Sequence, residues 1–162
     1  MLDSEFPVRT NRNHPVHQPV IESGNRAVIV FATICTKNRV PILATSAVHD
    51  AILQAWRTAD HWQVGRYVIL PDHIHLFCAP AAYPARSLVN WVRFWKATVA
   101  KATRAGPDAL WGKDFWDTQL RQSDSYAAKW EYVRNNPVRH GLVTRPEDWF
   151  YQGELHLLRW HD

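Results

Sequence analysis

The stretch YVILPDHIHLFCAP, from Tyr67 to Pro80, decides the fold because it holds two apolar segments joined by a tight turn. Pro71 and Asp72 favour that turn, and the flanking segments predict an antiparallel hairpin. Side chains at positions i and i+2 of a strand point to the same side. His73 and His75 should therefore share one face of an otherwise apolar hairpin, where two polar groups need partners or a function.

The segments around this hairpin predict the order β-α-β-β-α-β-α. Strands are expected at 27–36, 61–70 and 73–79, helices at 46–59 and 87–104, a short aromatic strand or loop at 109–122, and a last helix from Ser123 or Asp124 to about Pro137. This order is typical of a ferredoxin-like α+β sandwich, an antiparallel sheet with helices on one face. Residues 141–160 are expected to pack back on this body. Such a fold hosts many functions, so the function must be argued from the site.

Length and composition favour one folded domain with a polar extension. The chain has 162 residues, of which 46% are hydrophobic, enough for one core. Residues 1–26 are rich in Asn, His, Pro and Arg without an apolar period, which predicts a basic, partly irregular arm before a domain at 27–162. The net charge of +4 favours an anionic partner, most commonly nucleic acid. The nine Trp residues are expected mainly to pack in the core, while some could stack on unpaired bases.

Cysteine content and hydropathy predict a cytoplasmic protein without a membrane partner. Cys35 and Cys78 are the two cysteines, and they form neither a CxxC motif nor a disulfide framework. No apolar run is long enough to cross a bilayer, and the N-terminus lacks a signal-peptide pattern.

The histidine pair predicts a metal site, although a solvated hairpin face with two histidines is the alternative. Two imidazoles on one rigid strand can bind a metal, but a catalytic metal needs a third ligand. In EYVRNNPVRHG, Tyr132 and Asn136 have the i, i+4 spacing of one helix face. The amide oxygen of Asn136 could complete the set, and the Tyr132 phenol could attack a phosphate.

Three alternatives to this site remain open from the residues alone. Pro137 disfavours helical geometry at Asn136, which leaves Asn135 as another possible donor. Tyr132 taken alone could be an ordinary aromatic residue of the core. A structural zinc site is also conceivable, but the sequence has no Cys pair to complete it.

Two blocks of the sequence resemble the REP-associated tyrosine transposases, which belong to the HUH single-tyrosine transposases. They are YVILPDHIHLF and, later, FWDTQLRQSDSYAAKWEYVRNNPVRHGLVTRPEDW, and the resemblance extends over about 28–149. It implies an HUH endonuclease fold, with the catalytic domain at 27–162. It also implies His73 and His75 as metal ligands, Tyr132 as the nucleophile and Asn136 as the third ligand. The N-terminal region, which grips hairpin DNA in the family, departs from the usual pattern here.

The resemblance implies a transposase that cleaves single-stranded DNA through a 5′-phosphotyrosine intermediate. Its cofactor would be Mg²⁺ or Mn²⁺, and its substrate would be DNA with hairpin-forming repeats. The protein would be a monomer or a homodimer. Basic residues are expected to hold the DNA backbone, namely Arg86, Arg93, Lys96, Arg134 and Arg139. The alternative is a transposase-derived protein that binds single-stranded or hairpin DNA without cutting it. Histidine-triad hydrolases do not fit, because Phe77 occupies the place of their third histidine.

Overall fold

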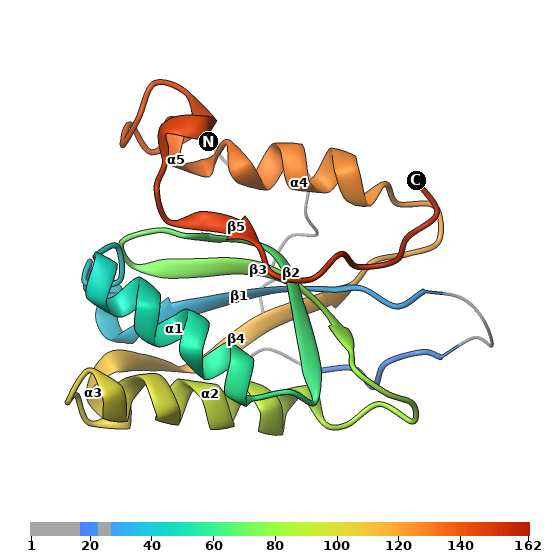
Figure 1. Cartoon of the computed structure of the whole chain (residues 1–162), viewed down its shortest axis with the longest axis horizontal. Helices are drawn as coiled ribbons and strands as arrows, with labels where there is room; N and C mark the ends of the chain where they lie inside the picture. Colours follow the sequence, from blue (N-terminus) through green and yellow to red (C-terminus); the bar gives the residue numbers. More distant parts are fainter. Residues whose placement is uncertain (1–16, 23–26) are drawn as a thin grey trace.

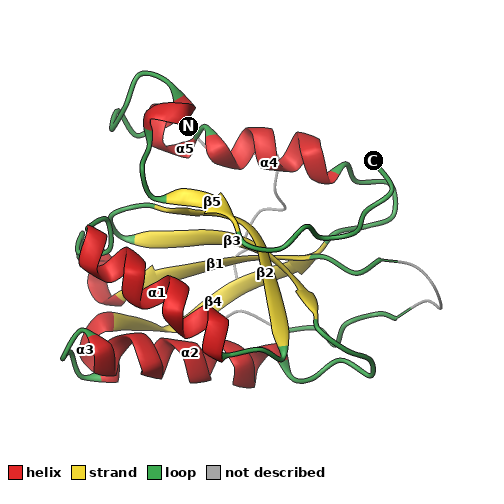
Figure 2. Cartoon of the chain, viewed as in Figure 1, coloured by secondary structure: helices red, strands yellow, loops and turns green. Residues whose placement is uncertain are grey.

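The structure, a computed structural model, describes residues 17–22 and 27–162. In that part of the chain a five-stranded antiparallel sheet lies between helices (Figures 1 and 2). The elements are β1 (Val30–Thr36), the 3₁₀ turn η1 (Lys37–Arg39), α1 (Ser46–Thr58), β2 (Trp62–Ile69), β3 (His73–Pro80), α2 (Leu88–Ala102), α3 (Pro107–Leu110), β4 (Trp111–Gln119), α4 (Tyr126–Arg134), α5 (Asn136–Arg139), the 3₁₀ turn η2 (Pro146–Asp148) and β5 (Gln152–Glu154). The predicted β-α-β-β-α-β-α order is confirmed, and the tail adds the fifth strand.

The strand order β4-β1-β3-β2-β5 places β1 and β3 at the centre of the sheet. All neighbouring strands pair antiparallel. The first four strands with α1 and α2 form the βαββαβ arrangement predicted from the sequence, so the α+β fold class is confirmed. The hairpin of β2 and β3 turns at Pro71-Asp72, where the Leu70 amide donates to the His73 carbonyl oxygen at 2.8 Å.

Helices α1 and α2 cover one face of the sheet. The larger of the two hydrophobic cores lies between these helices and that face, and it includes strand residues such as Ala32, Ile34 and Leu76. Tryptophans fill it, and their packing role is confirmed by the burial of Trp56, Trp62, Trp91, Trp95 and Trp111. Burial of such large apolar surfaces is the main stabilising contribution to the fold.

Helix α4 lies on the opposite face, so the expected one-sided placement of helices holds for α1 and α2 only (Figure 1). The physical reason is that the central strands are apolar on both faces. Ile29, Phe31 and Phe77 form a second core there with Tyr126 and Val133 of the α4 helix. Side chains of the C-terminal segment pack against the same core, namely Leu158 and Trp160.

Part of the predicted N-terminal arm packs on the domain. His17 pairs with Asp117 of β4 and stacks on Phe115 at a ring distance of 4.2 Å. The side chain of Gln119 bonds both the amide and the carbonyl of Ile21, at 2.9 and 3.0 Å. Residues 17–22 therefore run beside the edge strand β4, while 1–16 and 23–26 lie outside the described residues. Across the described residues, no helix has both the length and the apolar character needed to cross a membrane.

Candidate functional site

The two histidines of the hairpin stand at the start of β3, on the sheet face that α4 covers. Their side chains are buried, with residue exposures of 6% for His73 and 5% for His75. The ring centroids lie 4.7 Å apart, and the ring planes cross at 82°. The prediction that both share one face is confirmed, and burial places this polar pair in a position that requires partners.

Asp72 orients the ring of His73. The carboxylate oxygen Oδ1 accepts a hydrogen bond from His73 Nδ1 at 2.7 Å, and Oδ2 accepts one from Arg39 Nε at 3.0 Å. Arg39 reaches this place from the turn η1, where Asn38 and Arg39 have positive φ angles of 54° and 56°. Such backbone is uncommon for Arg and is held by its surroundings. Because Nδ1 is engaged, Nε2 is the nitrogen with which His73 would bind a metal.

The electrostatics of this pair favour a neutral imidazole beside an ionised carboxylate. Burial lowers the pKa of His73, and Asp72 opposes that shift only in part. The hydrogen bond with His73 is the main cause that lowers the pKa of Asp72 well below its usual range. A neutral imidazole is the form that coordinates metals.

His75 is oriented from the neighbouring strand. Thr33 lies directly across the β1–β3 ladder, and its Oγ1 is 2.9 Å from His75 Nδ1. The ring of Phe31 stacks on His75 at a centroid distance of 5.4 Å. The Nδ1 atoms of both histidines thus have protein partners, and Nε2 is again the nitrogen suited to a metal.

The segment predicted to complete the site covers the same face. Helix α4 begins at the Ser125 cap, and Tyr126 packs on Phe77 with ring centroids 5.0 Å apart. The helix ends at Arg134 before Pro137, as predicted, and α5 then starts at Asn136. Asn136 is therefore the first residue of a new turn rather than an interior position of one long helix.

Of the two candidate asparagines, Asn136 is the buried one. It is 2% exposed, and its Nδ2 donates to the carbonyl of Val133 at 2.9 Å. This bond occupies the amide nitrogen and leaves Oδ1 as the atom suited to a cation. Asn135 is half-buried, and its Nδ2 donates to the Glu131 carbonyl at the end of α4 at 2.6 Å.

Tyr132 is half-buried on α4, next to a cation. The guanidinium carbon of Arg139 lies 4.1 Å from the centre of the phenol ring, and Arg139 Nη2 donates to the Tyr132 carbonyl at 2.7 Å. The ring and the guanidinium therefore form a cation–π pair that ties α4 to α5.

Sequence reasoning missed His140, which the structure places beside the pair. It caps α5, and its ring centroid lies 5.9 Å from that of His73. The turn after α4 thus reaches the histidines of β3. The available signal was a histidine in NNPVRHG, eight residues after Tyr132. Among the described residues, no group of three or more His, Cys, Asp or Glu is arranged to hold a metal, so a site at the pair needs an oxygen donor of another type, such as Asn136.

The basic residues predicted to bind DNA fall on two sides of the sheet. Arg134 and Arg139 are on the histidine side, and Arg134 pairs with Glu131 at 3.0 Å and with Glu147 at 3.6 Å. The other three lie on α2 or just before it, across the sheet, namely Arg86, Arg93 and Lys96. Lys96 Nζ donates to the carbonyl of Gly112 at 2.9 Å, and burial lowers its pKa.

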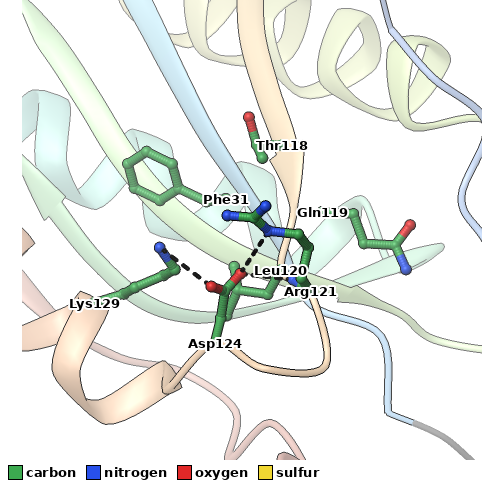
Figure 3. Close-up of a pocket in the computed structure, with 7 residues that line it drawn as sticks. All are labelled: Phe31, Thr118, Gln119, Leu120, Arg121, Asp124 and Lys129. Carbon is green, nitrogen blue, oxygen red and sulfur yellow. Dashed lines mark hydrogen bonds and ion pairs between the residues drawn. The ribbon is translucent and has the colours of Figure 1, made fainter. Parts of the chain in front are cut away.

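A pocket lies at the start of α4 (Figure 3). Phe31 lines it, and this ring also stacks on His75. Asp124 joins its two cationic side chains, Arg121 and Lys129, at 3.9 Å each. The charged groups of the pocket therefore pair with one another.

Comparison with known proteins finds relatives of this chain in sequence and in fold. A scan against known protein families finds no match. The REP-associated tyrosine transposase of Escherichia coli (strain K12) is 27% identical over 124 residues, covering 74% of this chain and 72% of that protein. A relative from Haemophilus influenzae with the same family name is 27% identical over 139 residues, covering 76% and 77%.

A solved structure shows the same fold. It is that of a REP-associated tyrosine transposase bound to a REP hairpin, with a TM-score of 0.69 and 23% identity over 85% of this chain and 80% of that one. In sequence and in fold, this chain is therefore a relative of the REP-associated tyrosine transposases.

Proposed function

We propose that this chain is a metal-dependent endonuclease and strand transferase that acts on single-stranded DNA at hairpin-forming repeats. The observation that carries the proposal is the proximity of His140 to His73, because it brings the turn after α4 to the histidine pair. That turn follows Tyr132 and includes Asn136. The relatives support the assignment, since they are transposases named for their tyrosine.

The donor chemistry of three side chains supports a divalent cation at this site. Nε2 of His73, Nε2 of His75 and Oδ1 of Asn136 would hold Mg²⁺ or Mn²⁺, because the Nδ1 and Nδ2 atoms of these side chains already have protein partners. When bound, the cation would stabilise negative charge on the phosphoryl oxygens.

Tyr132 is the proposed nucleophile. Its phenol oxygen attacks the phosphorus, the Tyr132 O–P bond forms and the P–O3′ bond breaks. The phenol loses its proton to water, and the departing 3′ oxygen gains one. The products are a 5′-phosphotyrosine and a free 3′-OH, and attack by another 3′-OH reverses the step and joins strands. The guanidinium of Arg139 over the Tyr132 ring attracts the anionic backbone to this place.

The test is a covalent adduct on a labelled oligonucleotide carrying a palindromic repeat found beside the gene. Wild-type protein with Mg²⁺ or Mn²⁺ should give an adduct that survives denaturing electrophoresis. Tyr132→Phe should give none, whereas Tyr126→Phe is the matched control. Tyr126 is on the same helix, but its hydroxyl accepts a hydrogen bond from the Arg66 amide at 3.2 Å within the fold. An adduct on Tyr132→Phe would disprove the nucleophile.

The same assay separates cutting from binding. Excess chelator, His73→Ala and His75→Ala should each abolish the adduct while the oligonucleotide still binds. If wild-type protein binds the hairpin and forms no adduct with either cation, the non-cleaving DNA-binding function is the correct one.

A further inference from the structure

The backbone of His140 is fixed to the turn that carries Asn136. Its amide donates to the carbonyl of Asn136 at 2.9 Å, and Leu142 donates to the carbonyl of Pro137 at 2.8 Å. Gly141 between them has a φ of 72°, the left-handed conformation that ends such turns. The backbone position from which the His140 side chain extends is therefore fixed.

The ring of His140 stands at the rim of the histidine site. His73 and His75 are buried, whereas His140 is exposed. Its ring meets that of His73 at 68°, with centroids 5.9 Å apart. His140 therefore presents an imidazole to solvent beside the buried pair.

The absence of a supporting contact distinguishes His140 from the two proposed imidazole ligands. Among the described residues, none orients its ring through a nitrogen, whereas Asp72 does so for His73 and Thr33 for His75. Metal-binding histidines usually have such support.

The surroundings suit an anion. Arg39, with 55% of its side chain exposed, extends from η1, and its Nη2 lies 3.3 Å from His73 Nδ1. A phosphodiester bound at the His140 ring beside His73 would therefore lie near this guanidinium group, while the guanidinium of Arg139 lies over the Tyr132 ring. The only carboxylate described next to His73, that of Asp72, is bonded to His73 and Arg39.

We propose that His140 binds the phosphate to be cleaved, by donating a ring N–H to one non-bridging oxygen. The inference rests on the proposed function and adds a substrate contact to it. A hydrogen bond to a charged oxygen is stronger than a neutral one, and it also restricts the phosphate to one orientation.

The experiment combines variants with phosphorothioate substrates. We expect His140→Ala to lower kcat/KM for cleavage roughly tenfold to a hundredfold, the effect of losing one hydrogen bond to a charged group. His140→Gln keeps an N–H donor and should recover part of the loss. Exposed His61 is the matched control, because it precedes β2 at the other end of the hairpin, and His61→Ala should cleave as wild type does.

A second measurement identifies the contact itself. Sulfur in place of the contacted oxygen, in one diastereomer of the cleaved linkage, should slow the wild-type protein but not slow His140→Ala further. Mn²⁺ affinity should be unchanged in His140→Ala and lost in His73→Ala. Equal cleavage by His140→Ala and wild type, an undiminished sulfur effect, or a loss of Mn²⁺ affinity would each overturn the inference.

Failure of the proposed function would look different. If wild-type protein forms no adduct, the role of His140 is tested by equilibrium binding of the uncut strand. In a series of oligonucleotides, a single phosphate at a different position is replaced by an uncharged methylphosphonate. At the contacted position the replacement should weaken binding by the wild-type protein and leave binding by His140→Ala unchanged. If every position weakens both proteins equally, His140 does not bind phosphate.

Discussion

Asp72 and His73 are neighbours in the chain, and their side chains are also hydrogen-bonded, with Asp72 Oδ1 2.7 Å from His73 Nδ1. Adjacent residues of a regular strand point to opposite faces, so this contact depends on the turn in which Asp72 lies. The Arg39 guanidinium holds the other carboxylate oxygen at 3.0 Å. The hairpin turn thereby sets the direction of the first imidazole of the site.

The first prediction is that Asp72→Asn weakens divalent-metal binding about 10–100-fold, the usual effect of removing a carboxylate that orients a ligand histidine. Mn²⁺ titration calorimetry measures it. Asp60→Asn, at an exposed position before β2, is the control and should bind as wild type does. Equal affinities for the wild-type protein and Asp72→Asn would show that His73 does not depend on Asp72.

The second prediction concerns His49, buried in α1 with Nε2 2.9 Å from the Tyr67 hydroxyl. Burial lowers the pKa of His49, and it raises that of Tyr67 to about 12, so both are neutral near pH 7. The unfolded chain takes up a proton at His49 near its ordinary pKa of about 6.5, while the folded protein resists it. His49 therefore makes its full contribution to the stability of the fold above a pH of about 6.5. That contribution is lost as the pH falls through the lowered pKa that His49 has in the folded protein.

The check is urea unfolding at pH 8 and at pH 5. The loss of unfolding free energy between the two pH values should be smaller in His49→Gln than in wild type. His61→Gln, at an exposed position, should lose as much as wild type. An unchanged loss in His49→Gln would mean that His49 is not held neutral by the fold.

The third prediction is that Gly65→Ala destabilises the protein by about 1–3 kcal/mol through overpacking. A Cβ at Gly65 would lie 2.6 Å from Leu158 Cδ1 and 2.8 Å from the Tyr126 hydroxyl oxygen. Gly106→Ala is the control, because its nearest neighbour would be the Ala109 Cβ at 3.9 Å. Thermal unfolding of both variants measures the difference. Equal unfolding midpoints would show that Leu158 in the tail and Tyr126 in α4 can move aside without a loss of stability.

The fourth prediction uses the two-sided distribution of basic residues. For a short single strand, Arg139→Ala should weaken binding and reduce the slope of log K against log salt by about one, as expected for one lost phosphate contact. Arg93→Ala, on exposed α2 surface across the sheet, should leave both unchanged. Equal effects would mean that the strand also runs over α2.

Much of the fold follows from local sequence patterns. Alternation and the Pro71-Asp72 turn predicted the β2–β3 hairpin, and helix periodicity predicted α1 and α2. Pro137 predicted the end of α4. The three-residue strand β5 was missed, because so short a segment shows no hydrophobic alternation. It forms a strand only by pairing with the edge of β2 in the folded protein.

The sequence by itself determined that His73 and His75 share one face, since strand geometry settles that locally. Only the tertiary structure decided which helix covers that face, because the central strands are apolar on both sides. It also decided which residues orient the pair, since Thr33 meets His75 through strand pairing and Arg39 meets Asp72 through a turn. His140 reaches His73 across 67 positions. Such contacts depend on how elements distant in sequence pack, which no local pattern encodes.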